Sequence, residues 1–203
     1  MTARGKIVTG LAIASAVLTV PVAAAATGEH DAAAGHEATQ ASYALPLPHD
    51  ALPRDEYDDP HHDYPSIDLP VPTGTDAYAV TSGQAVVFTD SGCGNGVELS
   101  ADDGALYTYC HFDSHAISSG PVQPGQLLGA TGNTGNSTGP HLHFQIKTDG
   151  AAVLRCPQNM LLAIYDGLAP PLPTDLPTSG CSTLRSTADN PRLDHLSEPA
   201  SQH

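Results

Sequence analysis

The segment GPHLHFQI, residues 139–146, places His141 and His143 one residue apart in an otherwise apolar run. Polar and apolar residues alternate along it with the period of a β-strand, so both imidazoles lie on one face and the apolar side chains on the other. Neighbouring imidazoles can bind a metal ion or transfer protons near neutral pH. The alternative is a polar sheet face whose histidines have no chemical task, and residues elsewhere in the chain decide between the two.

Histidines and carboxylates that could complete such a site lie in two other segments. HHDYPSID carries His61, His62 and Asp68, and LYTYCHF has His111 near the end of a predicted strand. A catalytic zinc ion takes three ligands from His and carboxylate and leaves one position open, and its reaction needs further groups that move protons. Because two rings on one strand face do not easily share one ion, we expect one ring on the metal and the other beside it. These residue types indicate a catalytic metal site.

Short strands must position these side chains. Between residues 61 and 167 the chain has runs rich in β-branched residues, separated by Gly- and Pro-containing turns that include the hairpin signal ADDG. The runs predict one all-β domain over 61–167, with a helical segment at 157–167. The flanks, 27–60 and 168–203, are rich in proline and lack hydrophobic periodicity. We therefore expect a mobile N-terminal segment and a proline-rich C-terminal segment with a disordered tail.

Residues 1–26 have the pattern of a secretory signal peptide. Arg4 and Lys6 precede an apolar stretch, and small residues that permit cleavage follow it. The apolar stretch is too short to predict a membrane span. We therefore expect an exported, soluble protein.

The chain is strongly acidic, with 7 basic and 22 acidic residues. Two of the basic residues lie in the signal peptide, so the rest of the chain carries a net charge of −17 when its histidines are neutral. So acidic a protein has no electrostatic attraction for nucleic acid or for an anionic membrane surface. We expect neither as a partner, and we expect a monomer.

Four cysteines in an exported chain indicate two disulfides, for which three pairings exist. We favour the local pairing, Cys93–Cys110 and Cys156–Cys181. The chain has no CxxC motif, so neither a thiolate zinc site nor a redox motif is expected. A metal ion would be bound by His and carboxylate.

The block from 61 to 147 resembles the LytM/lysostaphin-type zinc endopeptidases of peptidase family M23. The matching stretches are HHDYPSID, VPTGTDAYAVTSGQAV, GVELSADDGALYTYCHF and VQPGQLLGATGNTGNSTGPHLHFQI. The resemblance implies a small antiparallel sheet of the duplicated hybrid motif type with a narrow substrate groove. It also implies a Zn2+-dependent enzyme that hydrolyses peptide cross-links of peptidoglycan and acts outside the cell, at the bacterial cell wall.

The resemblance further implies which residues form the site. The metal ligands would be His62, Asp68 and His143, and the histidines that act on the water and the developing oxyanion would be His111 and His141. The alternative function is a non-catalytic module of the same fold that binds cell-wall peptides or activates another wall hydrolase. A purely structural zinc site is a third and less favoured alternative, because it leaves His111 and His141 without a role.

The first metal-binding motif departs from the family pattern. Five residues separate His62 from Asp68, where the family usually has three. A short bulge could restore the geometry, because coordination fixes distances rather than sequence separations. The histidine doublet leaves His61 as a second candidate. We favour His62 because it requires the shorter loop.

Overall fold

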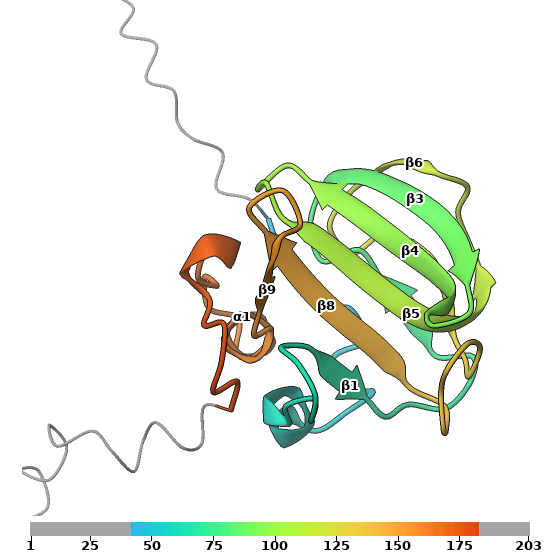
Figure 1. The fold of residues 1–203 in the computed structure, drawn as a ribbon, viewed down its shortest axis with the longest axis horizontal. Helices are drawn as coiled ribbons and strands as arrows, with labels where there is room; N and C mark the ends of the chain where they lie inside the picture. The colour runs from blue at the N-terminus through green and yellow to red at the C-terminus, as the bar shows by residue number, and fades with distance from the viewer. Residues whose placement is uncertain (1–41, 183–203) are drawn as a thin grey trace, which may run out of the picture. The chain divides into compact units, whose positions relative to one another are not determined.

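The computed structural model describes residues 42–182, and most of their regular structure is β-strand (Figure 1). The predicted all-β fold class is confirmed. The elements in chain order are η1 (Arg54–Asp58), β1 (Ile67–Leu69), β2 (Asp76–Tyr78), β3 (Gly83–Asp90), β4 (Gly94–Ala101), β5 (Leu106–His115), β6 (Gly120–Val122), β7 (Leu127–Thr131), β8 (Leu142–Thr148), β9 (Val153–Arg155), α1 (Gln158–Tyr165) and η2 (Pro173–Asp175).

The strands form one antiparallel sheet in the order β1-β8-β5-β4-β3-β6, with β9 paired to the free edge of β8 beyond β1 and β7 joined to β5. Local turns explain the central meander. The predicted ADDG hairpin joins β4 to β5, and Gly104 in it has a φ of +85°, which favours glycine. In Figure 1 the long strands β3, β4, β5 and β8 lie side by side as the largest surface of the sheet.

Alternation along β8 separates the core from the site. Leu142, Phe144 and Ile146 are completely buried, as their spacing predicts, and the histidines and Gln145 lie on the other face. Leu142, Phe144 and Ile146 pack in a core with other fully buried side chains, the largest of which are Tyr57, Tyr107, Tyr109, Phe112, Leu47, Ile67, Leu69, Leu99 and Leu128.

The N-terminal flank is the first correction to the sequence-based prediction. Residues 42–60, predicted as part of a mobile segment, are packed into the domain, and Leu47 and Tyr57 are buried in its core. The backbone N–H of Ala44 donates to the carbonyl oxygen of Val80 at 2.8 Å. A few widely spaced apolar residues anchor this segment, and such anchors leave no periodicity for a sequence pattern to detect.

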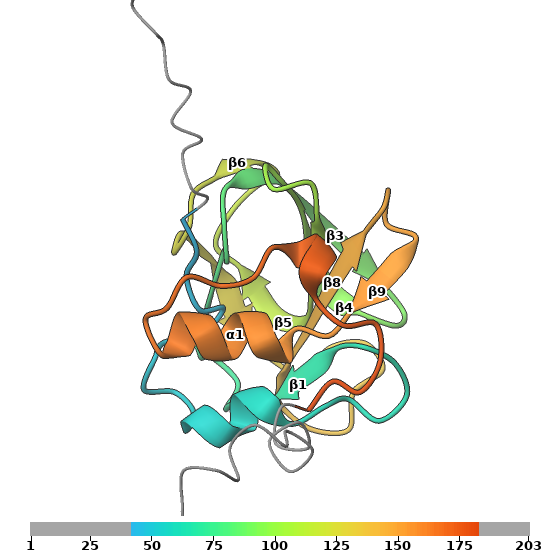
Figure 2. The same cartoon turned by 90° about the vertical axis from the view of Figure 1, so that its left-hand side faces the viewer.

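The C-terminal flank up to residue 182 is also part of the domain. Helix α1 confirms the predicted helical segment, and it lies beside η1, with the rings of Tyr57 and Tyr165 5.4 Å apart (Figure 2). After α1 the chain returns to β9, where the N–H of Cys156 donates to the carbonyl of Pro177 at 2.7 Å. The domain therefore extends beyond the predicted limits of 61–167 at both ends.

Some predictions lie outside the described residues. These are the signal peptide at 1–26, the mobile segment before residue 42 and the tail after residue 182. Over 42–182, no helix has the length and apolar character needed to cross a membrane.

Candidate metal centre and active-site groove

The candidate metal centre is built on the pairing of β1 with β8. Asp68 and His143 are direct partners across these antiparallel strands, so their side chains project from the same face. The Nδ1 of His143 lies 2.7 Å from Oδ1 of Asp68, and the His143 side chain is almost completely buried. Two donors that the sequence places 75 residues apart are thus brought into contact by strand register.

His61 is the third member of the cluster. Its backbone N–H donates to the carbonyl of Ser66 at 3.2 Å, which closes a loop just before β1. The loop places His61 Nε2 3.6 Å from Oδ2 of Asp68. One donor atom from each of His61, Asp68 and His143 lies within 4.8 Å of the other two. Two imidazole nitrogens and one carboxylate oxygen match the ligand set of a zinc ion that keeps a position open.

The choice of His62 over His61 as the metal-binding histidine is the second correction. The His62 side chain is 83% exposed, and its Nε2 faces Asp63 at 3.8 Å rather than Asp68. The closed loop from His61 to Ser66 turns the first ring of the doublet inward and leaves the second ring stacked on its outer side, 4.8 Å away. The shorter loop is therefore not the one that reaches the cluster.

His111 lies beside the cluster in an unusual backbone conformation. It sits in the irregular part of β5, between Cys110 and Phe112, with a φ of +69°. Its Nδ1 is 2.7 Å from the carbonyl oxygen of Thr134. Because a carbonyl only accepts, Nδ1 carries the proton and the neutral ring has its lone pair on Nε2. Burial lowers the pKa of His111, which favours this neutral form.

His141 occupies the opposite side of the same space. Its Nδ1 donates to the carbonyl of Gly139 at 2.8 Å. Its Nε2 lies 3.5 Å from Oδ1 of Asp68, to which it can donate only when the ring is protonated. The ring centroids of His111 and His141 are 4.6 Å apart. The structure therefore brings both predicted catalytic histidines next to the cluster, with their Nε2 atoms not bound to backbone.

The electrostatics of the cluster centre on Asp68. Burial alone would raise the pKa of Asp68, but the hydrogen bonds from His141 and His143 outweigh it and hold this pKa well below its usual range. The same carboxylate raises the pKa of His141. Burial lowers the pKa of His61, against the attraction of Asp68. Asp68 is therefore ionised and His61 is biased toward the neutral form, the states in which both groups can bind a metal ion.

Both disulfides are present with the local pairing, Cys93–Cys110 and Cys156–Cys181. The first borders the site, since Cys110 precedes His111 and the carbonyl of Cys93 accepts the His111 backbone N–H at 2.8 Å. The second joins the C-terminal segment to the strand end at β9.

The turn that carries Cys93 packs closely on the glycine-rich loop before β8. The backbone N–H of Asn136 donates to the carbonyl of Gly92 at 2.9 Å, and Thr134 Oγ1 accepts the backbone N–H of Asn95 at 3.0 Å. A methyl group at Gly135, whose φ is +74°, would collide with the backbone of Gly92, Cys93 and Gly94. This contact fixes the loop whose carbonyl holds His111.

Three further residues around the site were not predicted from the sequence. Tyr64 lies between the two metal-site histidines, with its hydroxyl 3.5 Å from His143 Nε2 and its ring 4.5 Å from that of His61. Thr134 and Gly139 act through backbone carbonyls, and a carbonyl is present at every residue and leaves no signal in the sequence. Tyr64 stands four residues before Asp68, at the position where the family spacing would place the histidine, but this spacing gives a tyrosine no role.

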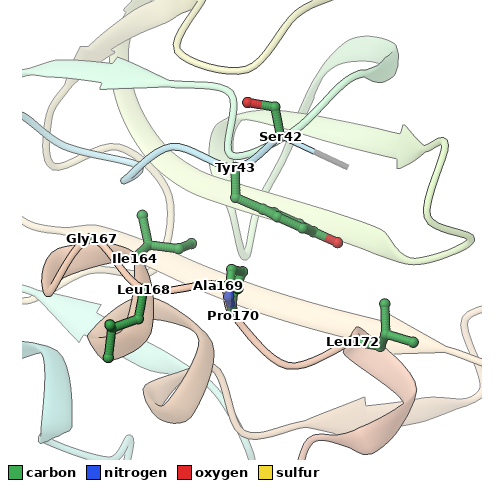
Figure 3. Close-up of a pocket in the computed structure, with 8 residues that line it drawn as sticks. All are labelled: Ser42, Tyr43, Ile164, Gly167, Leu168, Ala169, Pro170 and Leu172. Carbon is green, nitrogen blue, oxygen red and sulfur yellow. The ribbon is translucent and has the colours of Figure 1, made fainter. Parts of the chain in front are cut away.

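The cluster lies in a groove of about 530 Å3. One side carries the His61–Tyr64 loop, the other the Asn136–Thr138 stretch of the glycine-rich loop, and sheet residues of β3, β4, β5 and β8 also line it. A separate cavity of about 440 Å3 between Tyr43 and the end of α1 shares no lining residue with it (Figure 3). Its lining is mainly aliphatic and includes Ile164, Leu168 and Leu172 beside Tyr43, and it offers no His, Cys or carboxylate ligand for a metal.

Fold and site together define an antiparallel β-domain with a His/Asp metal centre and two further imidazoles in an open groove. Residues 62–154 match the model of peptidase family M23. The domain therefore resembles the peptidases of family M23, and the match covers 93 of the 203 residues of the chain.

Several curated proteins are similar to this chain. It is 35% identical over 89 residues to DD-carboxypeptidase/endopeptidase Mpg of Neisseria meningitidis, covering 43% of this chain and 20% of that protein. It is 32% identical over 123 residues to lysostaphin of Staphylococcus staphylolyticus, covering 58% and 26%. It is 33% identical over 108 residues to peptidoglycan DD-endopeptidase ShyA of Vibrio cholerae, covering 51% and 24%. The alignments thus span about a fifth to a quarter of these relatives.

Proposed function

We propose that this protein is an exported zinc-dependent endopeptidase that hydrolyses peptide cross-links of bacterial peptidoglycan. One observation carries the proposal: the His61–Asp68–His143 cluster lies in an open groove with the rings of two further histidines beside it. A structural metal site needs no such rings, and a peptide-binding module needs neither them nor the metal. The match of residues 62–154 to family M23 and the similarity to ShyA, whose name specifies peptidoglycan, support the choice of substrate.

His61, Asp68 and His143 would hold the ion, since they offer the N and O donors that zinc prefers. When bound, zinc supplies Lewis acidity, which polarises a peptide carbonyl and makes water a nucleophile near neutral pH. The hydrogen bond between the loop ends at His61 and Ser66 holds the first ligand in place before the metal binds. A preformed donor set of this kind reduces the cost of ordering the site.

His141 is the proposed acceptor of the proton from the attacking water. The carbonyl of Gly139 keeps the proton of the neutral ring on Nδ1, so the lone pair of Nε2 faces the Asp68 side of the cluster. A base must lie within hydrogen-bond reach of the proton it removes, and this nitrogen is directed at the space next to the ligands.

His111 is the proposed group that stabilises the developing oxyanion and assists the departing amine. Its Nδ1 proton is already donated to Thr134, so Nε2 can donate only after the ring has gained a second proton. Burial opposes a permanent charge on this ring. The proton that His141 takes from the water can be passed to Nε2 of His111, whose ring lies 4.6 Å from that of His141. His111 then donates it to the oxyanion and finally to the departing amine, which returns both rings to the neutral form.

The proposed location rests on the sequence and on the disulfides. Residues 1–26 have the signal-peptide pattern, and two disulfides are typical of proteins that mature in an oxidising compartment. Peptidoglycan lies in such a compartment, so the proposed substrate and the proposed export agree.

The experiment that tests the function combines metal content with turnover. The protein is expected to hold about one zinc ion per chain and to release peptides from purified peptidoglycan, and a chelator should abolish the release until zinc is restored. His111→Ala and His141→Ala should keep the ion and lose hydrolysis. Full zinc content without hydrolysis of any peptidoglycan by the unaltered protein would instead indicate a binding module.

A further inference from the structure

A polar row crosses the groove next to the metal cluster, and within residues 42–182 its side chains have no hydrogen-bond or ion-pair partner outside the row. Thr108 of β5 is paired with Glu98 of β4 on one side and with Gln145 of β8 on the other. All three side chains line the groove. Gln145 lies two residues after His143 on the same strand face, about 7 Å along the strand. The row is therefore within one or two residues of a peptide bond held at the cluster.

Thr108 provides the main evidence that the row binds a ligand. Its side chain is only 7% exposed, and its Oγ1 has no hydrogen-bond partner among the described residues. Buried hydroxyl groups are normally hydrogen-bonded, because an unpaired one loses its contact with water and gains nothing. The hydroxyl is flanked across the strands by Glu98 and Gln145, which line the same groove.

The negative charge of Glu98 and the acceptor groups of the row indicate which class of ligand the row binds. Within residues 42–182, Glu98 has no ion-pair partner, and the side chain of Gln145 makes no hydrogen bond. A carboxylate, a hydroxyl and an amide oxygen can all accept, and an ammonium group has three N–H donors to offer. A ligand carboxylate would be repelled by Glu98, and a neutral group would have to desolvate that charge without compensating it.

We propose that Glu98, Thr108 and Gln145 form a specificity subsite that binds the side-chain ammonium group of a diamino acid in the substrate peptide. This inference rests on the proposed function, because it assigns the substrate class of the same groove. Lys147 lies on the same face, two residues after Gln145, and also lines the groove. Its positive charge makes the opposite assignment, an anion subsite, the rival that the experiment must separate.

The experiment compares three forms of one substrate, cross-linked peptides released from peptidoglycan that retain a free side-chain amine. They are used native, N-acetylated, which removes the charge, and N-dimethylated, which keeps it. Binding to the full-length zinc-loaded protein is measured by calorimetry, and hydrolysis is measured as kcat/KM. Acetylation is expected to weaken both by about tenfold or more, the scale of a charged hydrogen bond, and dimethylation much less.

Variants connect that loss to the row. Glu98→Gln should lower the affinity for the native peptide about tenfold. This variant should bind the native and the acetylated peptide equally well. Thr108→Val should also weaken binding, although removal of an unpaired buried hydroxyl would by itself leave the fold unharmed or more stable. Lys147→Gln should leave affinity unchanged or raise it, since it removes a like charge. Asp102→Asn, at the β4–β5 turn outside the groove, controls for net charge.

The outcomes separate this inference from the function on which it rests. Hydrolysis that is indifferent to acetylation, or a loss with Lys147→Gln but not with Glu98→Gln, overturns the subsite and leaves the peptidase intact. Amine-dependent binding without hydrolysis keeps the subsite and overturns the peptidase. Loss of unfolding stability in Thr108→Val together with unchanged peptide binding would assign that hydroxyl a structural role only and overturn the proposal.

Discussion

The Nδ1–H of His111 donates to the carbonyl oxygen of Thr134 at 2.7 Å, across 23 residues of sequence. The bond sets the tautomer of the ring and directs its Nε2 toward the cluster. Thr134 in turn lies in a loop that packs on the turn carrying Cys93. The orientation of the proposed catalytic ring therefore depends on two loops and a disulfide.

The metal centre predicts different outcomes for the two neighbouring histidines. His61→Ala should reduce zinc content from about one ion per chain to near zero, because it removes one of three donors. His62→Ala is the matched control, and it should keep the ion because its ring is exposed and faces Asp63. Metal analysis after dialysis measures both. Loss of zinc in His62→Ala but not in His61→Ala would contradict the ligand assignment.

The packing of the glycine-rich loop predicts the effect of Gly135→Ala. This glycine has a φ of +74°, which costs an alanine about 1–2 kcal/mol, and the added methyl group would collide with the backbone around Cys93. We expect lower stability in urea unfolding and a lower kcat, because the His111 carbonyl partner is displaced.

Gly139→Ala provides the control for that substitution. No atom lies within 4 Å of a methyl group placed there, and the carbonyl that holds His141 is retained. Its stability and kcat should stay close to those of the unaltered protein. Equal effects of the two substitutions would show that loop packing does not position His111.

The two disulfides predict a separation of stability from activity. Removing either pair as a double Cys→Ser variant should cost about 2–5 kcal/mol of unfolding free energy. Loss of Cys93–Cys110 should also lower kcat while zinc stays bound, because the Cys93 carbonyl holds the backbone of His111. Loss of Cys156–Cys181 should leave kcat unchanged in the folded protein, since neither cysteine lines the groove. Parallel losses of kcat in both variants would refute this.

The packing of the N-terminal flank predicts that a core substitution before β1 strongly destabilises the domain. Leu47→Ala removes a side chain that is 1% exposed and should destabilise the domain by about 2–5 kcal/mol. Leu168→Ala, at a position 64% exposed, should change stability by less than about 0.5 kcal/mol. Denaturant unfolding of both variants is the measurement. A small effect at Leu47 would mean that residues 42–60 are not part of the cooperative unit.

The buried tyrosines predict alkaline unfolding. Burial raises the pKa of Tyr107 far above its usual range, and the neighbouring Asp103 adds to this. In the unfolded chain tyrosine titrates near pH 10. A raised pKa in the folded state means that stability is intact below about pH 10 and falls as the pH rises further, by up to about 1.4 kcal/mol per pH unit for each such group.

Tyr107→Phe isolates that contribution. The variant should show a shallower fall in unfolding free energy above pH 10, measured by urea unfolding at a series of pH values. Asp103 keeps a partner in the variant, because the hydroxyl of Tyr43 also donates to it at 2.8 Å. An unchanged slope would mean that Tyr107 ionises alike in the folded and unfolded chains.

Several features of this protein depend only on local order in the chain and were predicted correctly. Alternation in GPHLHFQI predicts which side chains of β8 are buried, and Leu142, Phe144 and Ile146 are. The ADDG turn and the helical segment follow equally from neighbouring residues. The pairing of the cysteines is also local, since each bridge closes a short stretch of chain. Periodicity and turn chemistry act over a few residues, so a single sequence displays them.

Which atoms meet at the site depends on contacts between residues far apart in the chain. His61 rather than His62 joins Asp68 because a hydrogen bond to Ser66 closes the preceding loop, and no spacing rule contains that contact. The carbonyl that orients His111 belongs to a backbone that is chemically the same at every residue. Leu47 is buried because it packs in a core formed by residues that lie far from it in the sequence. Coordination and hydrogen bonding depend on distances in space, and long-range packing sets those distances.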